Sequence, residues 1–255
     1  MPWGAVEAFP TPAYWAYQVL ARRVAGTTIR HRLGTSLDEE VAACLLGGHG
    51  IPAQVGLAAF KRLRERGVLR ASVSQAELLQ HLTEPLQVGG RAVRYRFAAQ
   101  KARYLYQAIV RLSEEKAPTQ SGRALRDWLT QLPGVGLKTA SWIARNTLDA
   151  DDVAILDIHI LRAGALAGFF DSGMTVERHY LALEERFIEF SSRLNVRPSE
   201  LDSVIWLEMK LSPTSVTGLL QGSRGGVMTA RPRSGLASRP SEKRRPNPDQ
   251  SLLFK

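Results

Sequence analysis

The chain has 255 residues, 44% of them hydrophobic, which is enough to form one or two domains with a substantial core. No run of 18 apolar residues occurs, and no charged segment followed by an apolar core opens the chain, so we expect neither a membrane span nor a signal peptide. The formal net charge of +10 favours an anionic partner, of which nucleic acid is the commonest.

The single cysteine, Cys44, excludes an intrachain disulfide, a four-cysteine iron–sulfur cluster and a thiolate zinc site. The histidines do not have a metal-ligand spacing, so we expect no metal and no cofactor. Six of the ten net positive charges come from residues 222–255, which contain eight Arg and Lys residues and only two acidic ones. The charge argument is therefore weaker for the rest of the chain. A cytoplasmic, nucleoid-associated monomer fits this composition.

Helical spacing of apolar residues, together with helix-capping residues, predicts an all-α fold. Residues 1–12 are rich in Pro and aromatic residues, and we expect irregular backbone there. Strand-like alternation of useful length is missing from the sequence. Helices are expected over residues 13–24, 37–46, 53–66, 74–82, 94–115, 122–132, 137–146, 157–167, 176–194 and 200–210.

After residue 211 the composition shifts to Ser, Gly, Pro, Thr and Arg, and the helical periodicity ends. We expect a helical core over 13–211 and a disordered basic tail over 212–255. The tail ends in a small apolar cluster within residues 250–254.

A glycine-bearing hairpin, Leu132-Pro133-Gly134-Val135-Gly136, connects two of the expected helices. Glycines allow a concave turn with exposed N–H groups and close approach of a phosphate, and the next helix start adds further unpaired N–H groups. We therefore assign Gly134, Val135 and Gly136 to binding of a DNA phosphate. An ordinary helix–turn–helix corner is the alternative interpretation.

Two charged residues behind the hairpin favour catalysis. Lys138 lies in the first turn of its helix, where the helix dipole and burial would lower its pKa and give a nucleophilic amine. Asp157, nineteen residues later, would stabilise positive charge on a deoxyribose ring as a base departs. Each residue also has a simpler interpretation, an exposed lysine and a helix N-cap.

The segments Leu132–Ala140 (LPGVGLKTA) and Ile155–His159 (ILDIH) resemble the helix-hairpin-helix DNA glycosylase superfamily. The resemblance implies a two-lobed helical fold, binding of double-stranded DNA that contains a damaged base, flipping of that base and excision. It further implies that Lys138 is the nucleophile of a bifunctional glycosylase/lyase and that Asp157 is catalytic. The lack of a four-cysteine cluster makes the cluster-free 8-oxoguanine glycosylases the most similar branch.

The same resemblance suggests a base pocket. Trp142 lies four residues after Lys138, and Asp202 and Trp206 are four residues apart on the last helix. The two tryptophans would sandwich a flipped purine, and Asp202 would accept a hydrogen bond from its edge. Both tryptophans could instead be core residues. Gln18 is a weaker pocket candidate.

Three further expectations remain open. His49, in a glycine-rich segment that replaces the usual polar loop, is a candidate for the wedge that fills the gap left by a flipped base. The terminal residues Gln250, Leu252, Leu253 and Phe254 resemble a peptide that binds the replication sliding clamp. The alternatives to an 8-oxoguanine enzyme are a glycosylase for another modified purine and a non-catalytic DNA-binding module.

Overall fold

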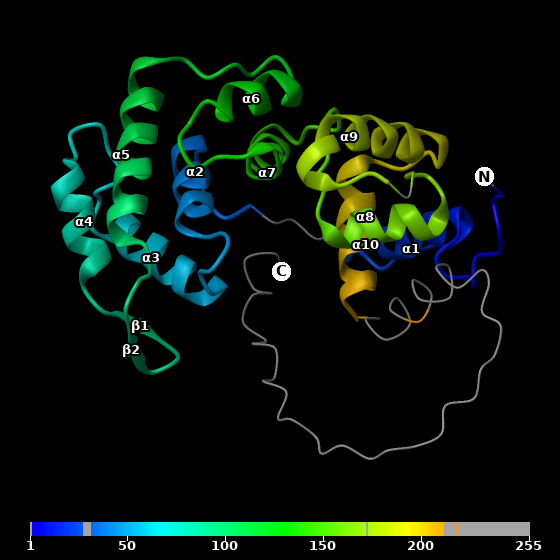
Figure 1. Ribbon diagram of the computed structural model, residues 1–255, viewed down its shortest axis with the longest axis horizontal. Helices are drawn as coiled ribbons and strands as arrows, with labels where there is room; N and C mark the ends of the chain where they lie inside the picture. The colour runs from blue at the N-terminus through cyan, green and yellow to red at the C-terminus, as the bar shows by residue number, and fades with distance from the viewer. Residues whose placement is uncertain (1, 28–31, 172, 212–217, 219–255) are drawn as a thin grey trace, which may run out of the picture.

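The computed structural model describes residues 2–27, 32–171, 173–211 and 218, which are mostly helical (Figure 1). The expected tail therefore lies almost wholly outside the described residues. In chain order the helices are α1 Pro12–Val24, α2 Leu37–Leu46, α3 Ala53–Glu65, α4 Gln75–Thr83, α5 Ala98–Glu114, α6 Gly122–Leu129, α7 Leu137–Leu148, α8 Ile158–Ala167, α9 Val176–Arg193 and α10 Pro198–Leu211.

One short β-hairpin departs from the all-α expectation. Strands β1 (Leu86–Val88) and β2 (Arg91–Val93) pair antiparallel around Gly89 and Gly90, both of which have positive φ. The expected turn is present, but three residues per strand are too few for alternation to be visible in the sequence. Residues 94–97 connect β2 to α5, and Phe97, the N-cap of α5, has φ +64°, so the helix begins at Ala98 and not at residue 94.

The two-lobed architecture is confirmed by two separate apolar cores. One core is built mainly from α2 to α7, with Leu63, Leu78 and Leu105 among its fully buried side chains. The second core joins α1 to α8, α9 and α10 around Trp15 and Phe187. Figure 1 shows these lobes as two groups of helices, with α6 and α7 between them.

The N-terminal helix α1 belongs to the lobe that the end of the chain forms. Arg22 pairs with Glu208 of α10 at 2.8 Å, and the Tyr14 hydroxyl donates to the same carboxylate at 3.2 Å. The chain thus starts in one lobe, crosses to build the other and returns through α8. No helix in the described part of the chain is long and apolar enough to cross a membrane.

Local capping chemistry explains several helix starts. The hydroxyls of Ser36, Ser74 and Ser121 accept hydrogen bonds from the backbone N–H three residues later, at 3.0–3.2 Å. Such caps satisfy N–H groups that have no partner within the helix, and they place α2, α4 and α6 close to their expected starts.

Candidate active site

The hairpin that connects α6 to α7 rests on two buried apolar residues and turns its glycines outward. Leu132 and Val135 are buried, whereas Pro133, Gly134 and Gly136 are exposed. The Val135 N–H donates to the Leu132 carbonyl at 3.1 Å, so Val135 supports the loop and its N–H already has a partner. The exposed glycines are left as the residues at which a phosphate could approach the backbone.

The two glycines are required for different reasons. Gly134 has φ +84°, and a Cβ at this position would lie 2.4 Å from the Tyr104 ring. Gly136 is the N-cap of α7 at φ −93°, and a Cβ there would have no neighbour within 4 Å. Gly134 therefore shapes the turn, while Gly136 keeps open the space in front of the helix start.

Lys138 lies in the first turn of α7 and is partly buried. Burial lowers the pKa of its ammonium group, and the nearby Asp157 carboxylate acts in the opposite direction. A lower pKa increases the fraction of neutral amine at physiological pH, which is the nucleophilic form.

Asp157 is the N-cap of α8. Its Oδ1 atom accepts hydrogen bonds from the N–H groups of His159 at 2.8 Å and Ile160 at 3.0 Å. Oδ2 takes part in neither bond, so the capping and catalytic interpretations do not exclude each other. Burial lowers the pKa of His159, which keeps this ring neutral beside Lys138.

Lys138 and Asp157 line one cavity together with the predicted base-pocket residues Trp142, Asp202 and Trp206. Its volume is about 30 Å³, close to the space that one water molecule occupies. A flipped purine would therefore enter only if the cavity widened. Trp206 is only partly buried, whereas Trp142, the other aromatic residue of this cavity, is buried.

A larger cavity of about 540 Å³ adjoins the first, because Lys138 and Trp142 border both. His49 lines it from the loop after α2, and Ile158 lines it from the start of α8. The predicted wedge residue is thus exposed and lines the same cavity as Lys138.

Trp142 is both a core residue and a pocket wall. Only 5% of it is exposed, and its Nε1–H donates to Glu40 Oε1 at 3.0 Å. The fully buried Glu40 also accepts from the N–H groups of Leu33 and Gly34 at 2.8 and 2.7 Å. Glu40 of α2 therefore fixes the orientation of the Trp142 ring, a contact between residues far apart in the sequence.

Asp202 lies at the predicted pocket, but both of its carboxylate oxygens already have protein partners. Oδ1 forms an ion pair with Arg145 and accepts from the Ser203 hydroxyl at 3.1 Å. Oδ2 accepts from the N–H of Ile155 at 3.3 Å. Burial raises the pKa of Asp202, while the Arg145 guanidinium opposes that shift.

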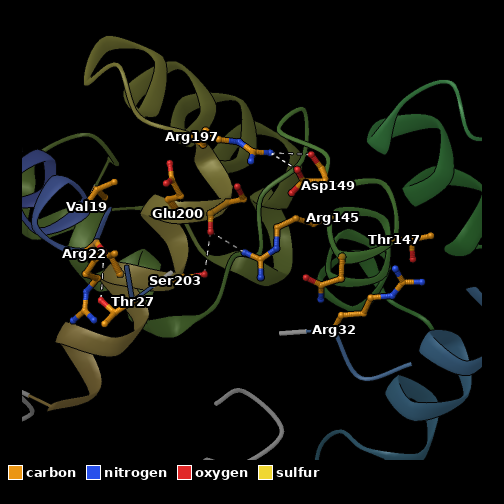
Figure 2. Close-up of a pocket in the computed structure, with 13 residues that line it drawn as sticks. Val19, Arg22, Thr27, Arg32, Arg145, Thr147, Asp149, Arg197, Glu200 and Ser203 are labelled. Carbon is orange, nitrogen blue, oxygen red and sulfur yellow. Dashed lines mark hydrogen bonds and ion pairs between the residues drawn. The ribbon is translucent and has the colours of Figure 1, made fainter. Parts of the chain in front are cut away.

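Arg145 was not foreseen from the sequence, although it lies one helical turn after Trp142 on α7. It borders the small cavity and also a cavity of about 390 Å³ enclosed by α1, α7 and α10. Figure 2 shows Arg145 from the side of this larger cavity, extending from α7 toward Ser203 of α10. Its spacing from Lys138 and Trp142 is the signal that could have identified it.

Other expectations differ from the structure. Gln18 is partly buried on α1 and lines neither cavity beside Lys138.

Phe97 was not predicted to lie near the His49 loop, because the sequence pattern placed it inside a helix. It is 43% exposed at φ +64°, and the Arg96 guanidinium carbon lies 4.6 Å from the centre of its ring. This pair adjoins Gly50 of the His49 loop. The clamp-like peptide lies outside the described residues.

Comparison with known proteins gives the family context of this site. The sequence matches the 8-oxoguanine DNA glycosylase family over residues 27–196. It is 31% identical over 117 residues to the 8-oxoguanine DNA glycosylase/AP lyase of Methanocaldococcus jannaschii, which covers 44% of this chain and 56% of that relative. The matched region thus spans just over half of the relative's length.

Solved structures with the same fold include the 8-oxoguanine DNA glycosylases of Methanocaldococcus jannaschii and Thermotoga maritima. Both are 22% identical to this chain, with TM-scores of 0.57 and 0.54. The first comparison covers 79% of this chain and 94% of the other, and the second 77% and 96%. The family match extends over most of the chain and includes the hairpin, Lys138 and Asp157. The chain belongs to the 8-oxoguanine DNA glycosylase family of the helix-hairpin-helix superfamily.

Proposed function

We propose that the chain is a bifunctional DNA glycosylase and abasic-site lyase of base-excision repair, with 8-oxoguanine in double-stranded DNA as its substrate. The observation that carries this proposal is that Lys138 and Asp157 line one cavity, directly behind the exposed glycines of the hairpin. Family membership and the printed activity of the Methanocaldococcus relative, 8-oxoguanine DNA glycosylase/AP lyase, support it.

The first step is base removal. The bond between C1′ and the purine nitrogen breaks, its electron pair leaves with the base, and positive charge develops on the sugar ring. The Asp157 carboxylate stabilises this charge. The lone pair of Lys138 Nζ forms a bond to C1′. The C1′–O4′ bond then breaks as a proton passes from the nitrogen to O4′, and the open-chain product is a protonated Schiff base.

The second step is strand cleavage. A proton leaves C2′, the resulting electron pair forms a double bond to C3′, and the C3′–O bond breaks so that the 3′ phosphate departs. Water then hydrolyses the Schiff base and releases Lys138.

The base would lodge between Trp142 and Trp206 after the small cavity widens. Trp142 is held rigidly by Glu40, whereas Trp206 contacts the His159 ring edge-on at 6.3 Å and lies under Lys210 Nζ at 4.6 Å. Trp206 is therefore the wall we expect to move. His49, with the adjacent Phe97, is the candidate for filling the space that the flipped base leaves in the duplex.

Borohydride trapping tests the proposal. The wild-type chain is expected to form a covalent complex with duplex DNA that contains 8-oxoguanine, because borohydride reduces the Schiff base. Lys138→Gln should abolish trapping, while Lys61→Gln, at an exposed lysine of α3, should leave it unchanged. Trapping of Lys138→Gln would move the nucleophile elsewhere. A panel of duplexes with other modified purines identifies the alternative substrate, and binding without base removal would identify a non-catalytic module.

The C-terminal peptide Gln250–Phe254 is proposed, from its sequence, to recruit the chain to the replication sliding clamp. A pull-down with purified clamp should retain the full chain and lose a variant that lacks residues 250–255. Equal retention of the two would exclude this role. We also propose a nucleoid-associated monomer, which sedimentation with and without DNA would test.

A further inference from the structure

The stretch that leads into Asp157 has unusual hydrogen bonding. Ala154, Ile155 and Leu156 are buried and lie outside any helix or strand. Each of their three N–H groups donates to a side chain from α9 or α10 and not to another backbone group. The acceptors are Glu184 Oε1 at 3.0 Å, Asp202 Oδ2 at 3.3 Å and the Tyr180 hydroxyl at 3.3 Å, in that order.

Two of the three acceptors, Glu184 and Asp202, are themselves held from behind. Glu184 forms a buried ion pair with Arg126 of α6 and accepts from the Ser141 hydroxyl of α7 at 3.3 Å. Asp202 is paired with Arg145 of α7. The arrangement links α6, α7, α9 and α10 to three consecutive residues.

Tyr180 contacts the stretch at two points. Its hydroxyl donates to the Ala154 carbonyl at 2.8 Å while it accepts from the Leu156 N–H. Burial raises the pKa of Tyr180, so the hydroxyl keeps its proton and stays able to donate. One hydroxyl thus fixes the backbone on both sides of Ile155.

The geometry points to Tyr180, Glu184 and Asp202 as positioning residues that hold the 154–156 stretch and thereby place the Asp157 carboxylate beside Lys138. This inference rests on the proposed function, in which Asp157 stabilises charge during base removal. It also reassigns Asp202, whose two oxygens are engaged with the protein, from reading a base to holding this backbone. A displacement of about 1 Å at a reacting group can lower a rate about 100-fold.

Tyr180→Phe is the sharpest test, because it removes one hydroxyl and keeps the buried ring. Ser191→Ala is the matched control. Ser191 lies on the same helix, α9, and its buried hydroxyl also donates to a backbone carbonyl, that of Val196 after the helix end. Single-turnover excision of 8-oxoguanine should fall about 10- to 100-fold in Tyr180→Phe and stay within about twofold in Ser191→Ala. Borohydride trapping on DNA with a preformed abasic site should stay within about twofold in both, because no base has to leave.

Asp202→Asn separates positioning from base reading. A slower excision with unchanged preference among modified purines supports positioning, and a normal rate with altered preference would overturn it. Equal excision rates for Tyr180→Phe and Ser191→Ala would also overturn it.

Hydrogen exchange adds a measurement that does not depend on enzyme activity. The peptide that spans residues 153–160 should exchange faster in Tyr180→Phe than in Ser191→Ala, and equal exchange would refute the inference. Failure of the wild type to excise any purine of the panel would refute the proposed function alone.

Discussion

Replacing Gly134 with alanine should destabilise the fold, because two effects act at this position. The φ of +84° lies in the region that L-residues avoid, which costs about 1–2 kcal/mol. The new methyl group would also lie 2.4 Å from Cδ2 and 3.2 Å from Cγ of Tyr104, so the whole ring must move. Overpacking of this kind costs about 1–3 kcal/mol.

Together these effects predict a loss of about 2–5 kcal/mol in the free energy of unfolding. A loss of 1 kcal/mol lowers the melting temperature by about 2–4 °C in a domain of this size, so Gly134→Ala should melt at least about 4 °C below wild type. The double variant Gly134→Ala/Tyr104→Ala, compared with Tyr104→Ala alone, should show only the backbone share of the loss.

Gly136→Ala is the matched comparison for the same hairpin. Its φ of −93° suits alanine, and open space surrounds the added methyl group, so the melting temperature should stay close to wild type. DNA affinity should nevertheless fall about tenfold, the equivalent of one lost phosphate contact of about 1.4 kcal/mol. Thermal melts and fluorescence anisotropy measure the two quantities. A Gly134→Ala protein that melts with wild type, or a Gly136→Ala protein that binds DNA normally, would refute the reasoning.

Four further outcomes are expected. Asp157→Asn should bind 8-oxoguanine DNA with near-normal affinity in anisotropy and lose at least about 100-fold in single-turnover excision, and full activity would remove Asp157 from the mechanism. Burial lowers the pKa of Lys138 in the folded state. Between the folded-state and unfolded-state pKa values, the unfolded chain therefore holds a proton on Lys138 that the folded chain lacks. The free energy of unfolding should thus rise with pH between these two values. Lys138→Met should lose this component of the slope in pH-dependent denaturant melts, and an unchanged slope would contradict the burial argument. Glu184→Ala should cost about 1–3 kcal/mol in the same melts, because the Arg126 guanidinium keeps only Asp127 as its ion-pair partner and the buried Ala154 N–H loses its acceptor, and a loss below 1 kcal/mol would contradict that. Glu40→Leu should shift the fluorescence spectrum of the chain, because Trp142 Nε1–H loses its acceptor, and an unchanged spectrum would argue against the bond.

The sequence identified the helices well because helix signals are local. Capping serines and the glycine runs act within four residues of the positions they mark, so α2 begins and ends at its expected residues, 37 and 46. The start of α5 was wrong because residues 94–97 form the connection from strand β2, and the left-handed backbone of Phe97 at its end is not visible in the apolar spacing. Pairing between strands depends on the partner strand and leaves only a weak signal in three residues.

The same difference between local signals and contacts between distant residues applies to the candidate active site. Glycines before a helix start, a lysine in its first turn and a later aspartate are a local pattern, and the chemistry proposed for it follows from residue types and spacing. The pocket residues Trp142, Asp202 and Trp206 were also placed near one another by the structure, but the engagement of Asp202 with Arg145 and Ile155 was not foreseeable. Gln18 lines neither cavity beside Lys138, and spacing within α1 does not indicate which neighbour that face meets.

The helical class, the position of the hairpin and the candidate residues for the proposed chemistry can be read from the sequence alone, because they depend on interactions over a few residues. Three features depend on how the lobes fold together. Helix α1 packs with α10, Glu40 orients Trp142, and the side chains of α9 and α10 hold the stretch before Asp157. These contacts join residues that are distant along the chain. Buried polar groups require partners, but the partner is chosen by how the lobes pack, and no local pattern encodes that choice.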